Sequence, residues 1–467
     1  MTSRPRFPSA PTDPTPLSQP LHFPFSNLTA KNRLHKSPIT ERLSTWHATD
    51  LSARGIPTPE LINVYRRWGQ GGFGTIATGN VMIDPLNLEA AGNPIIPADA
   101  PFDGLRFERF REMAAAAKEE GSLIVAQLSH AGRQAPANIQ PNPVSASDVH
   151  LAENAVGGVF AKPRALTREE IKQVVQGFAH AAEYCYKAGF DGVELHGAHG
   201  YLLAQFLAEG TNKRGDEYGG LLSNRARIVM EIVREVKRRV PEEGFMVGIK
   251  INSVEFQKGG FGTEECKWLC GELQRQRLDF VELSGGTYEV LAFEHKRESS
   301  RRREAYFLEF ADMIVPQLTK TRAYVTGGLR TVSGMVKALE TVHGVGLARP
   351  VCHEFDLPKK ILSGEAQGAV DYLLDDQDYL LTDVAAGTQV KIVGYDKAPL
   401  DMTQQYVVDS FNKSMGAWFQ QLTTDTTNSF YGWVDVDEEL LQPYGTPYRV
   451  SKGRSAVPEQ DSEAIKV

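Results

Sequence analysis

Residues 191–207 read DGVELHGAHGYLLAQFL, a short apolar run, a glycine-spaced turn and then a second apolar run of helical character. Gly197 and Gly200 let the chain turn tightly because they carry no Cβ atom. A strand, a turn and a helix in this order are typical of a parallel α/β protein. The turn is predicted to aim His196, His199 and Tyr201 into one pocket beyond the end of the strand.

Similar apolar or β-branched runs recur in both directions from this stretch, between about residues 21 and 364. They predict eight strands: Leu34–Ile39, Gly74–Thr78, Leu123–Leu128, Gly192–Leu195, Met246–Ile251, Phe280–Leu283, Ala323–Val325 and Gly344–Leu347. Helices are predicted between them: Thr58–Trp68, Phe107–Glu120, Thr167–Ala188, Asn224–Arg239, Thr263–Arg275, Ala305–Leu318 and Val332–Thr341. This alternation favours an α/β fold of the (β/α)8 TIM-barrel type. A doubly wound sheet is less favoured, because no G-x-G-x-x-G motif opens a helix after the first strand.

The alternation divides the chain into three parts. Residues 1–20 are rich in proline and predict a flexible or surface-draped arm. Residues 21–369 would form the barrel, with a long insertion after the third strand at 132–165, where active-site loops are placed. Residues 370–467 would form a C-terminal extension, packed on the barrel or on a partner subunit and disordered after about Gly453. Such an extension is compatible with a homo-oligomer.

Composition limits the function classes. The net charge of −7 argues against a nucleic-acid partner and against an anionic membrane surface. The four cysteines form no C-x-x-C pair, which is typical of a reduced, intracellular protein. Neither a signal peptide nor an apolar run of about 18 residues is visible, so no membrane span is expected. The chain is therefore predicted to be cytoplasmic, with a small-molecule substrate.

Catalytic residues of TIM barrels lie at the carboxyl ends of the strands. For His196, His199 and Tyr201, which follow the fourth strand, three interpretations compete. They are a metal site, a structural hydrogen-bonded cluster, and an anion site in which two imidazoles hold a carbonyl oxygen and the phenol donates a proton. The metal site lacks a third ligand, and Glu194 is expected to point away from His196. No metal is therefore predicted.

Two glycine-containing loops follow the seventh and eighth strands, where barrels often bind phosphate. Gly327 and Gly328 lie in the first loop, and Ala348 and Arg349 lie in the second. Plain strand-to-helix turns are the alternative for the glycines. Lys250 ends the fifth strand, where a charge needs a partner, and a salt bridge inside the barrel is the alternative to ligand binding.

Over roughly residues 21–364 the chain resembles the Old Yellow Enzyme family of NAD(P)H:flavin oxidoreductases. The motifs that match in order are Asn32-Arg33, Ser37-Pro38-Ile39-Thr40, 127–133 (QLSHAGR), 191–207, 216–220 (DEYGG) and Asn224-Arg225. The H-x-x-H-x-Y block followed by D-E-Y-G-G is the specific part of this pattern. The His-His pair resembles one branch of the family, and the two tails resemble a fungal-type member.

The resemblance implies FMN across the top of the barrel and NADPH or NADH as the reductant. The cofactor-binding positions that it implies are Pro38, Ile39, Thr40, Asn80, Gln127, Lys250, Gly327, Gly328, Ala348 and Arg349. It also implies ping-pong reduction of the C=C bond of α,β-unsaturated carbonyl or nitro compounds. His196 and His199 would hold the substrate oxygen while flavin N5 delivers hydride, and Tyr201 would protonate Cα.

The sequence departs from this pattern near Thr40, where the His-His branch has Cys, and at Arg42, where it has Tyr. The pocket wall at Arg42 and Trp46 is therefore not defined by the resemblance. Three alternatives remain beside the ene-reductase: an isomerase on the same flavin scaffold, which Tyr201 disfavours, a metal-dependent hydrolase that uses His196 and His199, and a non-catalytic flavin-binding protein.

Overall fold

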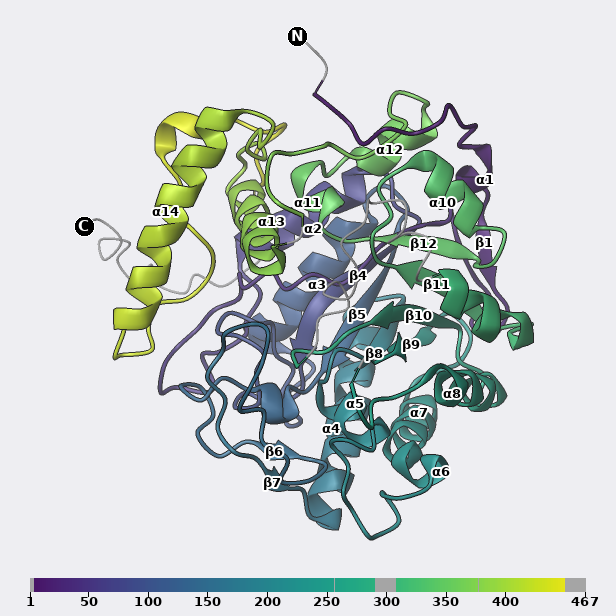
Figure 1. The fold of residues 1–467 in the computed structure, drawn as a ribbon. Coiled ribbons are helices and arrows are strands. Elements are labelled where there is room, and N and C mark those ends of the chain that lie inside the picture. The colour runs from purple at the N-terminus through teal and green to yellow at the C-terminus, as the bar shows by residue number, and fades with distance from the viewer. Residues whose placement is uncertain (1–3, 256, 290–307, 377, 450–467) are drawn as a thin grey trace.

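Eight parallel strands close into a barrel in the computed structural model, which describes residues 4–255, 257–289, 308–376 and 378–449 (Figure 1). The strands are β3 (Leu34–Lys36), β4 (Thr75–Met82), β5 (Leu123–Ser129), β8 (Gly192–Gly197), β9 (Met246–Val254), β10 (Phe280–Gly285), β11 (Arg322–Thr326) and β12 (Gly344–Leu347). The surrounding helices include α2 (Pro59–Gln70), α3 (Gly104–Lys118), α4 (Arg168–Lys187), α7 (Arg227–Arg239), α8 (Thr263–Arg275), α10 (Val332–Ala338), α11 (Pro350–His353) and α12 (Leu357–Leu362). The predicted (β/α)8 barrel is confirmed.

Some predicted bounds were wrong. β3 ends at Lys36, and Pro38, which has no N–H to donate to a neighbouring strand, lies in the segment that leaves the barrel. β4 runs past Thr78, with a register shift between Ala77 and Asn80. The helix predicted from Asn224 is two helices, α6 (Leu222–Arg225) and α7. The helix predicted over 305–318 begins outside the described residues, and residues 308–314 are helical before the 3-10 turn η2 (Val315–Gln317).

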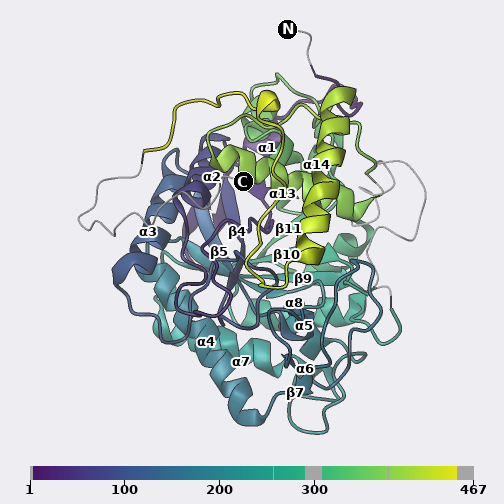
Figure 2. The same cartoon turned by 90° about the vertical axis from the view of Figure 1, so that its left-hand side faces the viewer.

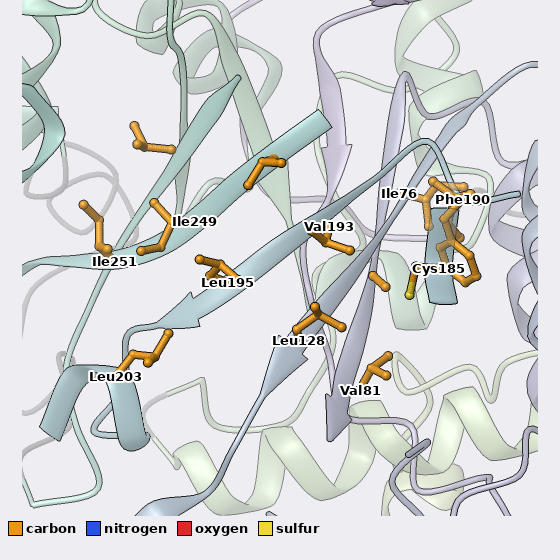
Figure 3. Close-up of a cluster of buried hydrophobic side chains, with 14 of the residues drawn as sticks. Ile76, Val81, Leu128, Cys185, Phe190, Val193, Leu195, Leu203, Ile249 and Ile251 are labelled. Atoms are coloured by element: carbon orange, nitrogen blue, oxygen red, sulfur yellow. The ribbon is translucent and has the colours of Figure 1, made fainter. Parts of the chain in front are cut away.

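Alternation along each strand separates an apolar outer layer from the inward-facing side chains, which are apolar at the amino-terminal end of the barrel and polar toward its carboxyl end. Val193 and Leu195 of β8 pack with Leu128, Ile249 and the free thiol of Cys185 in the layer between strands and helices (Figure 3). At the amino-terminal end of the barrel, the hairpin of β1 (Leu21–Phe23) and β2 (Leu28–Ala30) packs its apolar side chains against the first residues of several strands. The opposite, carboxyl end of the barrel holds the loops described below.

The N-terminal segment lies along the barrel from residue 4 onward. Both Nη atoms of Arg6 donate to the Glu354 carboxylate at 2.8 Å, and the Phe7 N–H donates to the Ala369 carbonyl at 2.9 Å. Leu17, in the short helix α1 (Thr15–Ser18), is fully buried. The described part of this segment thus packs against the barrel.

The C-terminal extension packs on the barrel of its own chain. Helix α13 (Tyr379–Gly394) contacts α2 and α11, and α14 (Gln405–Thr424) lies outside it (Figures 1 and 2). A second apolar cluster, which includes Phe411, Trp418 and Trp433, joins the two helices to the segment that ends in η3 (Glu438–Leu440). The predicted disordered tail after Gly453 lies outside the described residues. Within the described part of the chain, no helix combines the length and apolar character needed to cross a membrane.

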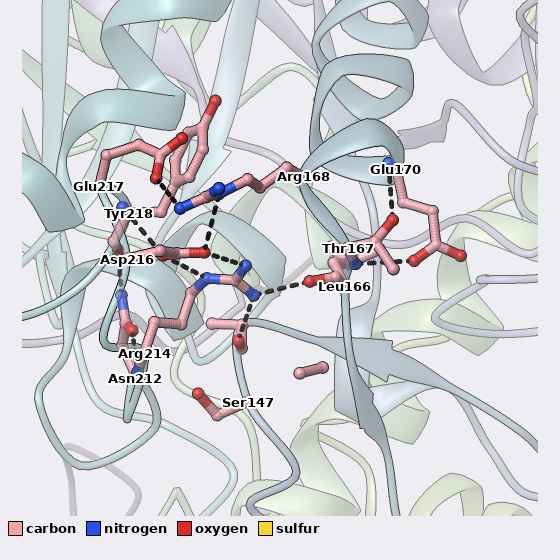
Figure 4. Close-up of polar contacts among 12 residues, drawn as sticks. Ser147, Leu166, Thr167, Arg168, Glu170, Asn212, Arg214, Asp216, Glu217 and Tyr218 are labelled. Carbon is pink, nitrogen blue, oxygen red and sulfur yellow. Dashed lines mark hydrogen bonds and ion pairs between the residues drawn. The ribbon is translucent and has the colours of Figure 1, made fainter.

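The D-E-Y-G-G motif clamps the insertion to the barrel (Figure 4). The insertion carries η1 (Gly132–Gln134), β6 (Val144–Ser145) and β7 (Arg164–Ala165). Arg214 pairs with Asp216 at 2.6 Å and donates to the carbonyl of Ala146, inside the insertion, at 3.0 Å and to that of Leu166, just after the insertion, at 2.7 Å. A Cβ atom at Gly219 would lie 2.1 Å from the Arg214 carbonyl oxygen, so the motif requires glycine there. This motif therefore has a structural role in fixing the loops around the site.

Candidate active site

A cavity of about 410 Å³ lies at the carboxyl ends of the barrel strands. Every predicted catalytic and cofactor-binding residue lines it: Pro38, Ile39, Thr40, Asn80, Gln127, His196, His199, Tyr201, Lys250, Gly327, Gly328, Ala348 and Arg349. The residues come from strands and loops along the whole barrel, and the closure of the sheet brings them together. All the predicted site residues therefore lie around one cavity.

The turn after β8 brings the two imidazoles and the phenol together. His199 has φ 57°, and Gly200 has φ 76°, so two consecutive residues adopt the left-handed conformation. This conformation is uncommon for a residue with a side chain. The ring centroid of His196 consequently lies 5.3 Å from that of His199 and 4.5 Å from that of Tyr201.

Hydrogen bonds set which imidazole nitrogen of His196 can donate. The Ala198 backbone N–H donates to His196 Nδ1 at 3.4 Å, so a neutral ring carries its proton on Nε2. The second imidazole is anchored by Ser284, whose hydroxyl lies 2.8 Å from His199 Nε2. Its backbone is held by Gln134, which donates to the His199 carbonyl at 3.2 Å.

Both imidazoles are uncharged at neutral pH. Burial, the neighbouring His199 and the Lys250 ammonium lower the pKa of His196 well below its usual value. Burial and Lys250 lower the pKa of His199 to about 3. The pair therefore offers neutral N–H donors, which can stabilise a developing oxyanion without a titration near neutral pH.

Tyr201 is a protonated phenol in this cavity. Burial, together with the nearby Tyr288 and Glu89, raises its pKa well above the usual value. Its hydroxyl lies 2.8 Å from the hydroxyl of Tyr288, which comes from the loop after β10 and also lines the cavity. A phenol that keeps its proton is suited to act as a general acid.

Gln127 and Lys250, two polar residues that line the cavity, each contact a buried carboxyl group. Gln127 Nε2 donates to Glu194 Oε1 at 2.7 Å, and Lys250 Nζ lies 2.9 Å from Glu282 Oε1. The salt bridge considered for Lys250 is thus present, and Lys250 also lines the cavity. The expectation that Glu194 points away from His196 was wrong, because residues two apart on a strand share a face.

His35, Glu194 and Glu282 place ligand atoms within 4.8 Å of one another. The Lys250 ammonium pairs with Glu282 of this group, so a positive charge already occupies the place that a metal ion would take. Burial and the neighbouring Glu282 raise the pKa of Glu194 well above its usual value. Among the described residues, His196 and His199 belong to no such group of three, so the metal alternative for them rests on two ligands.

Glycines of the loop after β11 and of strand β12 form a cradle beside an arginine that follows β12. Gly327 and Gly328 have φ of 136° and 74°, and a Cβ atom at Gly346 would lie 1.9 Å from Thr326 Oγ1. Arg349 lines the same end of the cavity and donates to the Thr382 hydroxyl. Backbone N–H groups of glycines and a guanidinium suit a phosphate group.

The wall after β3 is charged. Thr40 donates to Glu89 at 3.0 Å, and Asn80 Nδ2 lies 3.4 Å from the Thr40 hydroxyl. Arg42, with φ 54°, pairs with Glu89 at 3.3 Å and stacks on the Trp433 ring at 4.2 Å. Asn80 Oδ1 is buried without a partner in the described part of the protein, as expected of an acceptor that faces a ligand.

Sequence reasoning missed several residues of the cavity. Tyr379, Leu380 and Asp383 of α13 line it, as do Tyr288, Glu89, and Val156 and Phe160 of the insertion. The insertion was predicted to lie at this face, which is the signal that could have pointed to its residues. The α13 residues follow no barrel strand, so the strand-end rule could not select them.

Comparisons with known proteins agree with this geometry. A model of the NADH:flavin oxidoreductase / NADH oxidase family matches residues 16–367. An NADH-dependent flavin oxidoreductase of Aspergillus parasiticus is 49% identical over 421 residues, which cover 90% of this chain and 95% of that protein. A protein of the same description from Talaromyces variabilis is 36% identical over 359 residues, which cover 72% of this chain and 84% of that protein.

Solved structures give the same result. Morphinone reductase in complex with tetrahydroNAD has a TM-score of 0.59 and 26% identity, and the match covers 76% of this chain and 92% of that chain. The glycine cradle, Arg349, Gln127 and Lys250 fit FMN, which this family binds, together with a nicotinamide as reductant. The chain is thus an NAD(P)H-dependent flavin oxidoreductase and belongs to the NADH:flavin oxidoreductase / NADH oxidase family, the Old Yellow Enzyme family.

Proposed function

We propose that this flavin oxidoreductase reduces the C=C bond of α,β-unsaturated carbonyl or nitro compounds. The observation that carries the proposal is the meeting of two neutral imidazoles and one protonated phenol in the cavity that fits FMN. NADH or NADPH would reduce the enzyme and leave before the alkene enters, in a ping-pong cycle. NADH is favoured, because the two fungal relatives are described as NADH-dependent flavin oxidoreductases.

In this proposal His196 and His199 bind the carbonyl or nitro oxygen through their N–H groups. Their donation polarises the C=C bond and stabilises the negative charge that develops on the oxygen. Because both rings are neutral, this binding does not titrate near neutral pH. Lys250 and Gln127 would bind the pyrimidine part of the flavin. Thr40 and Asn80 would bind its edge, and Pro38 and Ile39 would contact its ring system. The phosphate of FMN would be bound by Gly327, Gly328, Ala348 and Arg349.

Bound FMN supplies a hydride for the Cβ atom of the alkene. Tyr201 then gives its hydroxyl proton to Cα, so hydride and proton together complete the saturated product. The phenol is protonated before the reaction, because burial raises the pKa of Tyr201. The isomerase alternative has no use for this donor, which is why reduction is favoured over it.

The test of the proton donor is Tyr201→Phe, measured in the two half-reactions by anaerobic stopped-flow spectroscopy. Reoxidation of the reduced enzyme by 2-cyclohexenone should slow by about 100-fold to 10,000-fold, the range typical of general-acid catalysis. Reduction of the flavin by NADH should change little. Tyr186→Phe, which alters a phenol that is 40% exposed, is the matched control. Equal rates for Tyr201→Phe and the control would refute the assignment.

The test of the oxygen-binding site is the affinity for a phenol, whose phenolate form mimics an anionic substrate oxygen. His196→Ala and His199→Ala should each weaken binding by roughly 10-fold or more, the value of a hydrogen bond to a charged group. Unchanged affinity in both variants would contradict the assignment. A wild-type protein that contains FMN and oxidises NADH but reduces no alkene would refute the proposed ene-reductase function.

A further inference from the structure

A second phenol stands beside the proposed proton donor. The hydroxyl of Tyr288 lies 2.8 Å from that of Tyr201, and the two ring centroids are 5.9 Å apart. Both residues line the cavity, but they come from different strands of the barrel, since Tyr201 follows β8 and Tyr288 follows β10. The proposed function uses only the first of these hydroxyl groups.

Contacts on several sides hold Tyr288 in this position. The Ala155 N–H of the insertion donates to the Tyr288 carbonyl at 2.7 Å, and the Phe160 ring lies 6.1 Å from the Tyr288 ring. The preceding residue, Thr287, forms a backbone bridge with His199. The loop after β10 is thus joined to the catalytic turn, and the distance between the two hydroxyl groups is set by the fold.

A phenolate on Tyr201 is costly in this cavity. Glu89 is a nearby carboxylate, and burial removes the water that would solvate the charge. Burial, with Glu89 and Tyr379, likewise raises the pKa of Tyr288 well above its usual value, so Tyr288 keeps a proton that it can donate. A donor at 2.8 Å can stabilise the Tyr201 oxygen while that oxygen gives up its own proton.

We propose that Tyr288 is a proton-relay residue for Tyr201. As the Tyr201 O–H bond breaks and its proton moves to Cα, the Tyr288 hydroxyl proton moves to the Tyr201 oxygen, and solvent returns a proton to Tyr288. One proton leaves solvent and one reaches carbon, so the relay is balanced and moves no electrons. The inference rests on the proposed ene-reductase function.

The test compares two substrates in the FMN-loaded enzyme. 2-Cyclohexenone needs a proton from the enzyme, whereas 1-nitrocyclohexene accepts hydride to give a nitronate that water can protonate later. Tyr288→Phe should slow reoxidation by the enone about tenfold or more and leave the rate with the nitroalkene within about twofold. A variant with a distorted cavity would slow both substrates, and Tyr186→Phe is again the control.

A double-variant cycle separates a relay from an independent effect. If Tyr288 acts through Tyr201, then Tyr201→Phe/Tyr288→Phe reacts with the enone no more slowly than Tyr201→Phe alone. Multiplied losses in the double variant would overturn the relay, as would an enone rate for Tyr288→Phe equal to that of the wild type.

Solvent isotope measurements give an independent readout of the relay. In mixtures of H₂O and D₂O, two protons in motion predict a curved dependence of the wild-type enone rate on deuterium content. The dependence should become linear in Tyr288→Phe, and a linear wild-type dependence would overturn the relay. Wild-type enzyme that reduces neither substrate would refute the ene-reductase and the relay together. Slow Tyr201→Phe with normal Tyr288→Phe would refute only the relay.

Discussion

Trp433→Ala should destabilise the protein strongly, because Trp433 joins the C-terminal extension to the barrel. The indole is 2% exposed, its Nε1–H donates to the Glu41 carbonyl at 2.7 Å, and the Arg42 guanidinium stacks on its ring at 4.2 Å. The ring packs so closely on α13 that a Cβ atom at Gly387 would lie 2.1 Å from it. Removal of a buried tryptophan costs about 3–5 kcal/mol.

Trp433→Ala also leaves the Glu41 carbonyl without its hydrogen bond, and an unpaired buried carbonyl costs about 1–3 kcal/mol. This cost partly overlaps with the cost of the lost packing, so we expect the loss of unfolding free energy to lie in the upper part of the range of about 3–5 kcal/mol. Trp433→Phe keeps much of the ring, so its cost should be smaller than that of Trp433→Ala. The assay is urea unfolding of the FMN-saturated protein, followed by far-ultraviolet circular dichroism. Trp268→Ala, at a tryptophan 38% exposed, should cost about 1 kcal/mol or less. The reasoning fails if Trp433→Ala is no more destabilising than Trp268→Ala.

Three other predictions concern acid stability, the clamp and the glycine cradle. Burial lowers the pKa of His353 to about 3 from 6.5, so the folded state binds this proton less readily and stability falls as the pH drops below about 6.5. Between pH 7 and pH 5 this histidine costs roughly 2 kcal/mol, and urea unfolding of His353→Gln should show that much less loss. Asp216→Ala should expose the insertion to limited proteolysis, because Arg214 loses a carboxylate at 2.6 Å, and an unchanged digestion rate would contradict the clamp. Gly346→Val should yield protein without FMN, because even a Cβ atom would lie 1.9 Å from Thr326 Oγ1, and a normal flavin content would contradict this.

The sequence could predict the barrel and the turn that carries His196, His199 and Tyr201, because both follow from local patterns. Val193 and Leu195 alternate with polar residues in a short strand, and Gly197 and Gly200 mark the turn. Parallel strands then bring all their carboxyl ends to one side, so residues as distant as Thr40 and Arg349 could be assigned to one site.

The remaining parts of the site depend on packing between distant segments. Tyr288 is one of 15 tyrosines, and nothing near it in the chain marks it as the partner of Tyr201. Asp383 and Tyr379 reach the cavity only because α13 packs on α2 and α11. Arg42, which has a left-handed φ, stacks on Trp433, a residue far along the chain, so its surroundings could not be predicted from the local sequence.

The C-terminal extension also bears on when during synthesis the active site can form. Trp433 hydrogen-bonds Glu41, a residue made 392 positions earlier, and α13 supplies one side of the cavity. A nascent chain that has emerged with all of its barrel strands still lacks Tyr379, Asp383 and the indole beneath Arg42. The complete cavity therefore forms only after the extension has been translated and has packed on the barrel. FMN can bind to the complete site only at that late stage of synthesis.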